Sequence, residues 1–190
     1  MEREYEMMNN IFQGKLVSLV AEDPQVVANA YAKWNRNAEF KRLLDADPAM
    51  LWSEKKIKEW LEKEMEDEGT KFFTFQIREL QSGKMIGFTG IGDLLWNHGD
   101  GWVGIGIGEP EYWGKGYGTE AMQLTLRYAF TELNMHRVTL GVFDYNPRAI
   151  RSYEKAGFKL EGRLRGEVSR QGSHHDILLM GVLRSEWEMA

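Results

Sequence analysis

The segment EYWGKGYGT, residues 111–119, combines glycine and lysine in a pattern suited to binding a phosphate group. Its glycines occupy alternate positions, Gly114, Gly116 and Gly118, and Lys115 stands between the first two. The following residues favour a helix, in whose interior glycine costs about 1 kcal/mol relative to alanine. Glycine lets the backbone approach a ligand, and free N–H groups at a helix start attract phosphate oxygens. The pattern predicts a phosphate-binding turn; a tight strand-to-helix turn without a ligand is the alternative.

Two familiar phosphate-binding motifs do not fit these glycines. The P-loop, G-x-x-x-x-G-K-[ST], requires glycine where Glu109 stands and Ser or Thr where Gly116 stands. The dinucleotide fingerprint, G-x-G-x-x-G, requires a different spacing, and Asp144 lies about 28 residues downstream instead of the expected distance of about 20. A nicotinamide-nucleotide enzyme that uses the same glycines is therefore disfavoured but stays an alternative.

A second segment, NPRAIRSYEKAGF (146–158), places an amide and a phenol on one predicted helix. Asn146 before Pro147 is typical of a helix N-cap, and Gly157 is typical of a helix end. Tyr153 lies seven residues after Asn146, two turns along the helix and therefore on the same face. An unperturbed tyrosine has a pKa near 10, so its hydroxyl is protonated at pH 7 and can act as a proton donor. Periodicity alone makes Tyr153 a core aromatic residue.

Hydrophobic periodicity and turn residues predict the elements that carry these segments. Helices are expected within 24–68, with Asp23 as the first N-cap, and over 52–69 with Ser53 as cap and Gly69 as stop. Further helices are expected over 116–133 and 146–157, and strands over 15–20, 71–80, 85–96, 102–108, 137–143, 158–170 and 173–184. The expected order is helices, then an antiparallel meander, then a strand–helix–strand–helix unit, and last a hairpin. This order predicts an α+β fold with a mixed, mostly antiparallel central sheet flanked by helices.

Composition bounds the class of protein. The 190 residues are 43% hydrophobic and fit one domain, 1–190. Cysteine is absent, which excludes disulfides and cysteine-based metal sites. We expect no signal peptide, no transmembrane helix and a cytoplasmic location. The net charge of -5 argues against nucleic acid as a partner and favours a cationic one.

Both segments together resemble the GNAT acetyltransferases. The acyl-CoA motif of that family is [QR]-x-x-G-x-[GA], matched here at Gly116 and Gly118, whereas Trp113 stands where the motif has Gln or Arg. Residues 146–158 are similar to the family's N-x-x-A-x-x-x-Y-E-K-x-G-F. The resemblance covers nearly the whole chain and is greatest to the branch of ribosomal-protein N-terminal acetyltransferases and spermidine acetyltransferases. It implies a single-domain GNAT fold and direct transfer of an acetyl group from acetyl-CoA to an amine.

The resemblance also implies roles for individual residues. Tyr153 would be the general acid beside the thioester sulfur. Residues of the strand before the glycines, 102–108, would give backbone groups to the pantetheine arm, and residues 113–119 would hold the pyrophosphate. The cofactor-binding set is Ile105, Gly106, Ile107, Gly108, Trp113, Gly114, Lys115, Gly116, Tyr117, Gly118, Thr119, Asn146, Ser152, Tyr153 and Lys155.

The sequence leaves the general base and the acceptor open. Glu109, Asp93 and Glu39 are candidates for the base, and a water chain is the alternative. The acceptor would be a polyamine-like or other cationic amine, or a protein N-terminus. No metal is expected, because His174 and His175 are adjacent on a strand and point to opposite faces. Homodimerisation is common in the family, and a catalytically silent acetyl-CoA-binding module is the alternative function.

Overall fold

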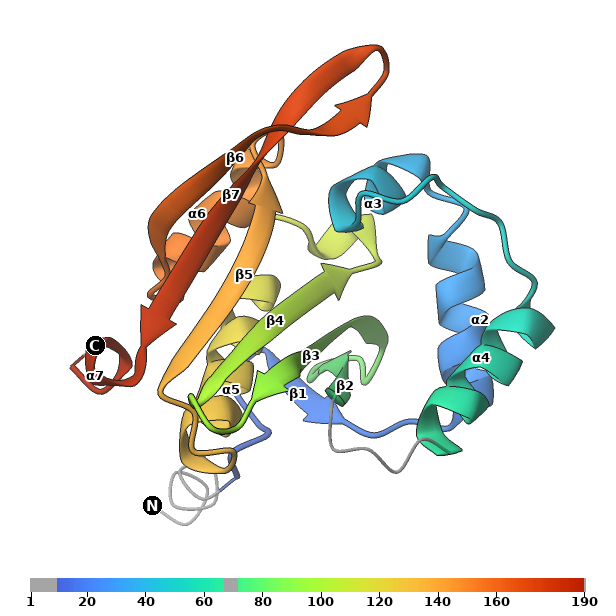
Figure 1. Cartoon of the computed structure of the whole chain (residues 1–190). Helices are drawn as coiled ribbons and strands as arrows, with labels where there is room; N and C mark the ends of the chain where they lie inside the picture. The colour runs from blue at the N-terminus through green and yellow to red at the C-terminus, as the bar shows by residue number, and fades with distance from the viewer. Residues whose placement is uncertain (1–9, 67–71, 190) are drawn as a thin grey trace.

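The computed structural model describes residues 10–66 and 72–189 (Figure 1). One sheet of seven strands forms its centre, in the spatial order β1-β2-β3-β4-β5-β7-β6. The strands are β1 (Val17–Val20), β2 (Phe72–Glu79), β3 (Met85–Leu95), β4 (Asp100–Ile107), β5 (Arg137–Phe143), β6 (Lys159–Arg170) and β7 (Ser173–Leu183). The helices are α2 (Pro24–Trp34), α3 (Ala38–Leu44), α4 (Glu54–Glu66), η1 (Pro110–Tyr112), α5 (Tyr117–Thr131), α6 (Pro147–Lys155) and α7 (Arg184–Trp187). The predicted α+β class with a mixed, mostly antiparallel sheet is confirmed.

Strands β4 and β5 are the parallel exception in this sheet, and they separate along their length. They pair only from Asp100–Arg137 to Trp102–Thr139, whereas β4 continues to pair with β3 as far as Ile107. The connection between them carries α5, as a parallel pair requires a crossover. Beyond Trp102 the β5-facing edge of β4 therefore has no partner strand, and the two strands diverge in Figure 1.

Helix α5 packs its apolar face on the sheet. Four of its residues lie in the main core cluster: Met122, Leu126, Ala129 and Phe130. Leu133, just beyond its end, is partly buried against the same cluster. Each fully buried side chain of this size contributes about 1.5–3 kcal/mol to folding. This packing fixes the N-terminal end of α5, and with it the glycine turn, relative to β4.

Helices α2, α3 and α4 lie together, apart from α5 and α6 (Figure 1). Asp23 caps α2 as predicted, since its carboxylate accepts from the Gln25 N–H at 2.8 Å. Ser53 likewise accepts from the Lys56 N–H at 3.2 Å, whereas Gly69, the predicted stop of α4, lies outside the described residues. Val27 of α2 is buried in a core cluster, whereas its neighbour Val26 is 42% exposed.

The other differences from the predicted elements are small. The strand expected from residue 102 begins at Asp100, and the helix expected to reach 133 ends at Thr131. Two short helices were not predicted, η1 and α7. Each spans at most four residues, too few for a helical period to be visible in the sequence.

Candidate active site

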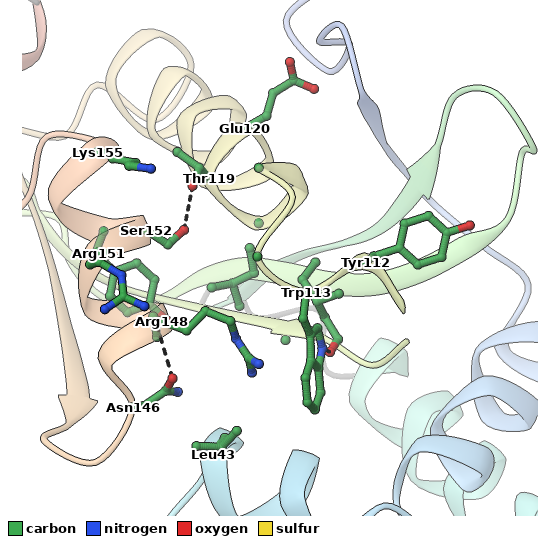
Figure 2. A pocket seen from close by; sticks show the side chains of 18 of the residues that line it. Leu43, Tyr112, Trp113, Thr119, Glu120, Asn146, Arg148, Arg151, Ser152 and Lys155 are labelled. Atoms are coloured by element: carbon green, nitrogen blue, oxygen red, sulfur yellow. Dashed lines mark hydrogen bonds between the residues drawn. The ribbon is translucent and has the colours of Figure 1, made fainter. Parts of the chain in front are cut away.

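A cavity of 390 Å³ lies between the glycine turn, the end of β4 and α6. We call it the donor cavity. Most of the predicted cofactor-binding residues line it: Ile105, Gly106, Ile107, Trp113, Gly114, Gly116, Gly118, Thr119, Asn146, Ser152, Tyr153 and Lys155. The fold thus brings the two sequence motifs, which are separated along the chain by α5 and β5, to opposite walls of one cavity (Figure 2).

The glycine turn exposes the start of α5 to this cavity. Gly114 and Gly116 have φ angles of 72° and 93°, in the left-handed region that glycine adopts without strain. Gly116 is the N-cap of α5, and no side chain caps the helix there. The first N–H groups of α5 are therefore available to an anion in the cavity, where the helix dipole also favours negative charge.

Three predicted cofactor-binding residues do not line the donor cavity: Gly108, Lys115 and Tyr117. A Cβ on Gly108 would lie 2.0 Å from an indole carbon of Trp34, so this glycine serves close packing. Tyr117 packs edge-to-face on Tyr112, with ring centroids 5.0 Å apart. Lys115 is exposed on the turn. The two glycines that flank Lys115 have left-handed backbone angles, and these angles set the direction in which its side chain leaves the turn.

Positive charge reaches the donor cavity from α6 instead. Arg148, Arg151 and Lys155 line the wall opposite the glycine turn and appear along α6 in Figure 2. Their spacing of three and four residues places them on neighbouring turns of one helix face. Because three cations line this wall, it can neutralise much of the charge of a pyrophosphate.

Trp113, at the motif position of Gln or Arg, makes two specific contacts. Its indole N–H donates to the backbone oxygen of Ile107 at 2.6 Å, which ties the turn to the end of β4. The guanidinium of Arg148 lies 4.0 Å from the centroid of its ring. Trp113 and Arg148 project toward one another from the two walls in Figure 2. Cation–π stacking of this kind holds the long Arg148 side chain across the cavity.

Hydrogen bonds fix α6 in position. Asn146 is 7% exposed and caps the helix through its side-chain oxygen, which accepts from the Ala149 N–H at 3.2 Å. Its amide nitrogen remains as a donor toward the cavity. The hydroxyls of Thr119 and Ser152 bond to each other at 2.8 Å and join the start of α5 to α6 (Figure 2).

A second cavity of 950 Å³ lies between the sheet and helices α2, α3 and α4. We call it the acceptor cavity, because the amine acceptor that the sequence resemblance implies would lie there. Six residues line both cavities: Phe40, Leu43, Leu44, Ile105, Asn146 and Tyr153. The two cavities therefore meet along a boundary between α3, β4 and α6 that includes Tyr153. Gly104 lines only the acceptor cavity, and a Cβ built on it meets no atom within 4 Å. The junction lies where β4 has diverged from β5.

The Tyr153 hydroxyl is suited to donate a proton at this junction. Its ring packs edge-to-face on Phe158, with centroids 6.1 Å apart, and burial raises the pKa of the hydroxyl to about 12. The group therefore stays protonated at every pH at which the protein would work. Among the residues that the structure describes, Tyr153 is the only residue within α6 that lines both cavities. Asn146, at the cap of α6, lines both as well.

Comparison with known proteins decides the family. A family model described as acetyltransferase (GNAT) domain matches residues 16–159. The chain belongs to the GNAT acetyltransferase family. It is accordingly an N-acetyltransferase, with acetyl-CoA as the acetyl donor.

Individual relatives share limited sequence identity with this GNAT acetyltransferase. A prophage-derived uncharacterized N-acetyltransferase of Bacillus subtilis is 29% identical over 133 residues, which cover 70% of this chain and 72% of that protein. Spermidine N(1)-acetyltransferase of Vibrio cholerae is 38% identical over 78 residues, 41% of this chain and 45% of the relative. A crystal structure of the Vibrio cholerae spermidine N-acetyltransferase in complex with CoA and spermine superposes with a TM-score of 0.77 at 26% identity, covering 92% and 99% of the two chains.

The three predicted base candidates of this GNAT acetyltransferase line neither cavity. Glu109 is 4% exposed, and its carboxylate accepts from Lys33 Nζ at 2.6 Å, Trp34 Nε1 at 2.8 Å and Lys84 Nζ at 2.7 Å. Burial raises its pKa, but these hydrogen bonds outweigh that effect and lower the pKa to about 2. A carboxylate so fully engaged is a structural anchor and accepts a proton poorly. Asp93 and Glu39 lie outside both walls.

His175, one of the two adjacent histidines on β7, has other contacts. His175 Nδ1 lies 3.5 Å from an Asp144 oxygen, and its ring meets that of Tyr145 at 4.7 Å between centroids. In residues 10–66 and 72–189 no group of three or more His, Asp or Glu side chains could hold a metal ion. In the same ranges no helix is long and apolar enough to cross a bilayer.

Sequence reasoning missed Arg148 and Arg151, although a signal was present. The two arginines lie three residues apart on the predicted helix over 146–157. The sequence already assigns two residues of that segment, Asn146 and Tyr153, to the site. It also missed the acceptor cavity, whose wall comes from five separate stretches of chain and has no local pattern.

Proposed function

We propose that the chain transfers the acetyl group of acetyl-CoA directly to the primary amine of a small molecule that lies in the acceptor cavity. The observation that carries this proposal is the meeting of donor and acceptor cavities beside Tyr153. A thioester in the donor cavity and an amine in the acceptor cavity would come together there without a covalent enzyme intermediate. The silent acetyl-CoA-binding module would need no second cavity at this point.

The walls of the donor cavity support a specific placement of acetyl-CoA. The pyrophosphate would lie between the N–H groups of Gly116 and Gly118 and the cations Arg148, Arg151 and Lys155. The pantetheine arm would run along the free edge of β4 and accept a hydrogen bond from Asn146. In this placement Lys115 would reach only the outer phosphate, since it does not line the cavity.

The chemistry follows from these positions. The lone pair of the neutral amine attacks the thioester carbonyl, and a backbone N–H of β4 stabilises the oxygen as it gains negative charge. The carbon–sulfur bond then breaks, and Tyr153 gives its proton to the departing sulfur. The nitrogen loses a proton to water, and a proton returns to Tyr153 through water. The products are the acetylated amine and CoA with a free thiol.

The named relatives support an amine as acceptor. One is called a spermidine N(1)-acetyltransferase, and one solved structure contains CoA and spermine. A protein N-terminus is the second acceptor that the sequence resemblance implies. The 950 Å³ volume of the acceptor cavity favours a small molecule, because that size is typical of ligand pockets.

The test is a thermal-shift measurement with acetyl-CoA, followed by an assay of free-thiol release against a panel of amines. The panel contains polyamines, arylalkylamines and short peptides. Stabilisation together with thiol release for a small amine is the expected result. Stabilisation with release only for peptides would move the acceptor to protein N-termini, and stabilisation with no release would favour the silent module.

We further propose a cytoplasmic location, where acetyl-CoA is available, and self-association of the chain through a sheet edge. Strands β1 and β6 are the two edges of the sheet. A related Vibrio cholerae spermidine N-acetyltransferase is described as dodecameric, so light scattering after gel filtration should be read for assemblies larger than a dimer.

A further inference from the structure

The acceptor cavity has a largely aromatic wall. Six of its aromatic residues lie on α2, in the segment before α4, on α4 itself and on the strands: Tyr31, Trp52, Trp60, Phe72, Phe88 and Phe143. Several touch one another, with ring centroids 5.0 Å apart for Tyr31 and Phe88 and 6.5 Å for Trp52 and Trp60. These pairs give the wall a fixed shape that flat or branched hydrocarbon groups can pack against.

Part of this wall is exposed in the absence of a ligand. Trp60 is 43% exposed and Phe72 is 62% exposed, and both line the cavity. Apolar surface left open in a hollow commonly marks the place where a ligand or partner binds. The apolar surface here is continuous with the junction at Tyr153, since all belong to one cavity.

Two of the three carboxylates of the same wall are already paired. In the described part of the chain they are Glu22, Asp45 and Asp47. Glu22 accepts a hydrogen bond from Arg78 Nε, and Asp45 accepts from Lys41 Nζ at 2.8 Å. Asp47 is exposed at the rim. Among the described residues, the wall therefore offers a ligand one carboxylate without a side-chain partner, that of Asp47 at the rim.

Lys41 neutralises Asp45, so this pair offers no net attraction to a multiply charged ligand. Its side chain is 15% exposed and belongs to the cavity wall itself. A polyamine carries a positive charge every few carbons, and each charge that leaves water needs an unpaired acceptor. The single rim carboxylate cannot pair with both of the remaining ammonium groups of a polyamine. The other ammonium group would lie beside aromatic rings, whose faces attract a cation by only about 0.5–1 kcal/mol at an exposed site.

We infer that the acceptor is a monoamine carried on an aromatic or branched hydrocarbon body, and not a polyamine; this rests on the proposed function for the meaning of the cavity. The amine would lie at Tyr153, where it is acetylated. The hydrocarbon body would lie against the aromatic wall, and the paired carboxylates would stay with Arg78 and Lys41.

The first experiment measures binding directly, by calorimetry on the protein saturated with CoA. 2-Phenylethylamine and spermidine are the probes, each in 0.05 M and 0.5 M salt. We expect 2-phenylethylamine to bind about tenfold or more tightly than spermidine, with little change between the salt concentrations, because apolar contacts are not screened. Equal or tighter binding of spermidine, or no binding of 2-phenylethylamine, overturns the inference.

Variants add an independent test. Trp60→Ala should weaken 2-phenylethylamine binding about fivefold or more, whereas Trp96→Ala, an equally exposed tryptophan outside both cavities, should leave it unchanged. Lys41→Met frees the Asp45 carboxylate and should strengthen spermidine binding. If Trp60→Ala and Trp96→Ala behave alike, or if Lys41→Met weakens spermidine binding, the aromatic wall does not select the acceptor.

The same samples separate this inference from the proposed function. Thiol release from acetyl-CoA is measured with both amines. Binding of 2-phenylethylamine without thiol release from any amine would refute acetyl transfer at this site and leave the ligand class standing. Thiol release with spermidine and none with 2-phenylethylamine would refute the ligand class and leave acetyl transfer standing.

Discussion

The guanidinium of Arg148 stacks on the indole of Trp113, with its central carbon 4.0 Å from the ring centroid. The two residues come from opposite walls of the donor cavity, α6 and the glycine turn. Trp113 occupies the position at which the acyl-CoA motif has Gln or Arg, so the stack supplies from α6 a positive charge that the motif would supply from the turn. Arg148 thereby becomes the residue on which cofactor affinity should depend.

Replacing Arg148 by Gln should raise KM for acetyl-CoA with kcat nearly unchanged. The stack and one phosphate contact are worth about 1–2 kcal/mol together, or about 5- to 30-fold in KM. Arg165→Gln, on an exposed part of β6 away from both cavities, is the matched control. Steady-state kinetics at two salt concentrations measure both constants, and a fall in kcat at constant KM would contradict the assignment.

Replacing Gly116 by Ala should weaken both stability and cofactor binding. At φ 93° an alanine costs about 1–2 kcal/mol, and the shift of the turn would move the first N–H groups of α5. Gly83→Ala is the control, because Gly83 has φ 68° in a turn far from the cavities. Both variants should lose similar stability in urea unfolding, and only Gly116→Ala should raise KM for acetyl-CoA. An equal KM for the two would remove the phosphate role of the turn.

Replacing Tyr153 by Phe should lower kcat while leaving acetyl-CoA affinity intact. Loss of a positioned general acid typically costs about 10²–10⁴ in rate. The ring, and therefore the contact with Phe158, is retained. Tyr128→Phe, at a half-buried position beside Phe75, controls for loss of a hydroxyl elsewhere. Kinetics and a separate titration with acetyl-CoA give the two quantities. Equal losses in kcat and affinity would mean that Tyr153 only packs.

The pH profile of kcat/KM should rise from pH 6 to 9 with the fraction of neutral amine. Burial raises the pKa of Tyr153 to about 12, so its proton is present throughout this range and no fall in rate should begin below about pH 10. Stopped-flow thiol detection in constant-ionic-strength buffers measures the profile. A descending limb near pH 8 or 9 would show that the acid is another group.

The fold was predictable wherever the signal was local. The glycine turn, the Asn146 cap and the helix that carries Tyr153 each follow from residues within one turn or helix. Lys115 was assigned to the site from its charge and its place in the glycine motif, and its direction depended on the left-handed glycines beside it. The role of Glu109 was not predictable, because its partners Lys33 and Lys84 lie far away along the chain. The acceptor wall combines residues as distant as Tyr31 and Phe143, which only the tertiary fold brings together.

Replacing Glu109 by Gln should destabilise the protein in a pH-dependent way. The folded-state pKa of about 2 lies below the ordinary value of 4.5, so ionised Glu109 stabilises the fold above pH 4.5. We expect a loss of about 1–3 kcal/mol at pH 7, discounted because Lys33 is 64% exposed. The difference from the parent protein should shrink as pH falls from 4.5 toward 2. Urea unfolding at pH 7 and pH 3 measures it, and a constant difference would show that only packing was lost.

The empty space beside Gly104 has a consequence for how this enzyme can change over generations. A side chain added there meets no atom of the protein, so a mutation to alanine should carry almost no folding penalty. It would, however, place a methyl group directly in the path of the acceptor, at the point where β4 leaves β5. The range of amines that the enzyme accepts can therefore change through single-nucleotide mutations at this position. Such mutations leave the stability of the fold unchanged, so selection for stability does not remove them. The same freedom offers protein engineers a site at which to narrow the enzyme toward slender amines.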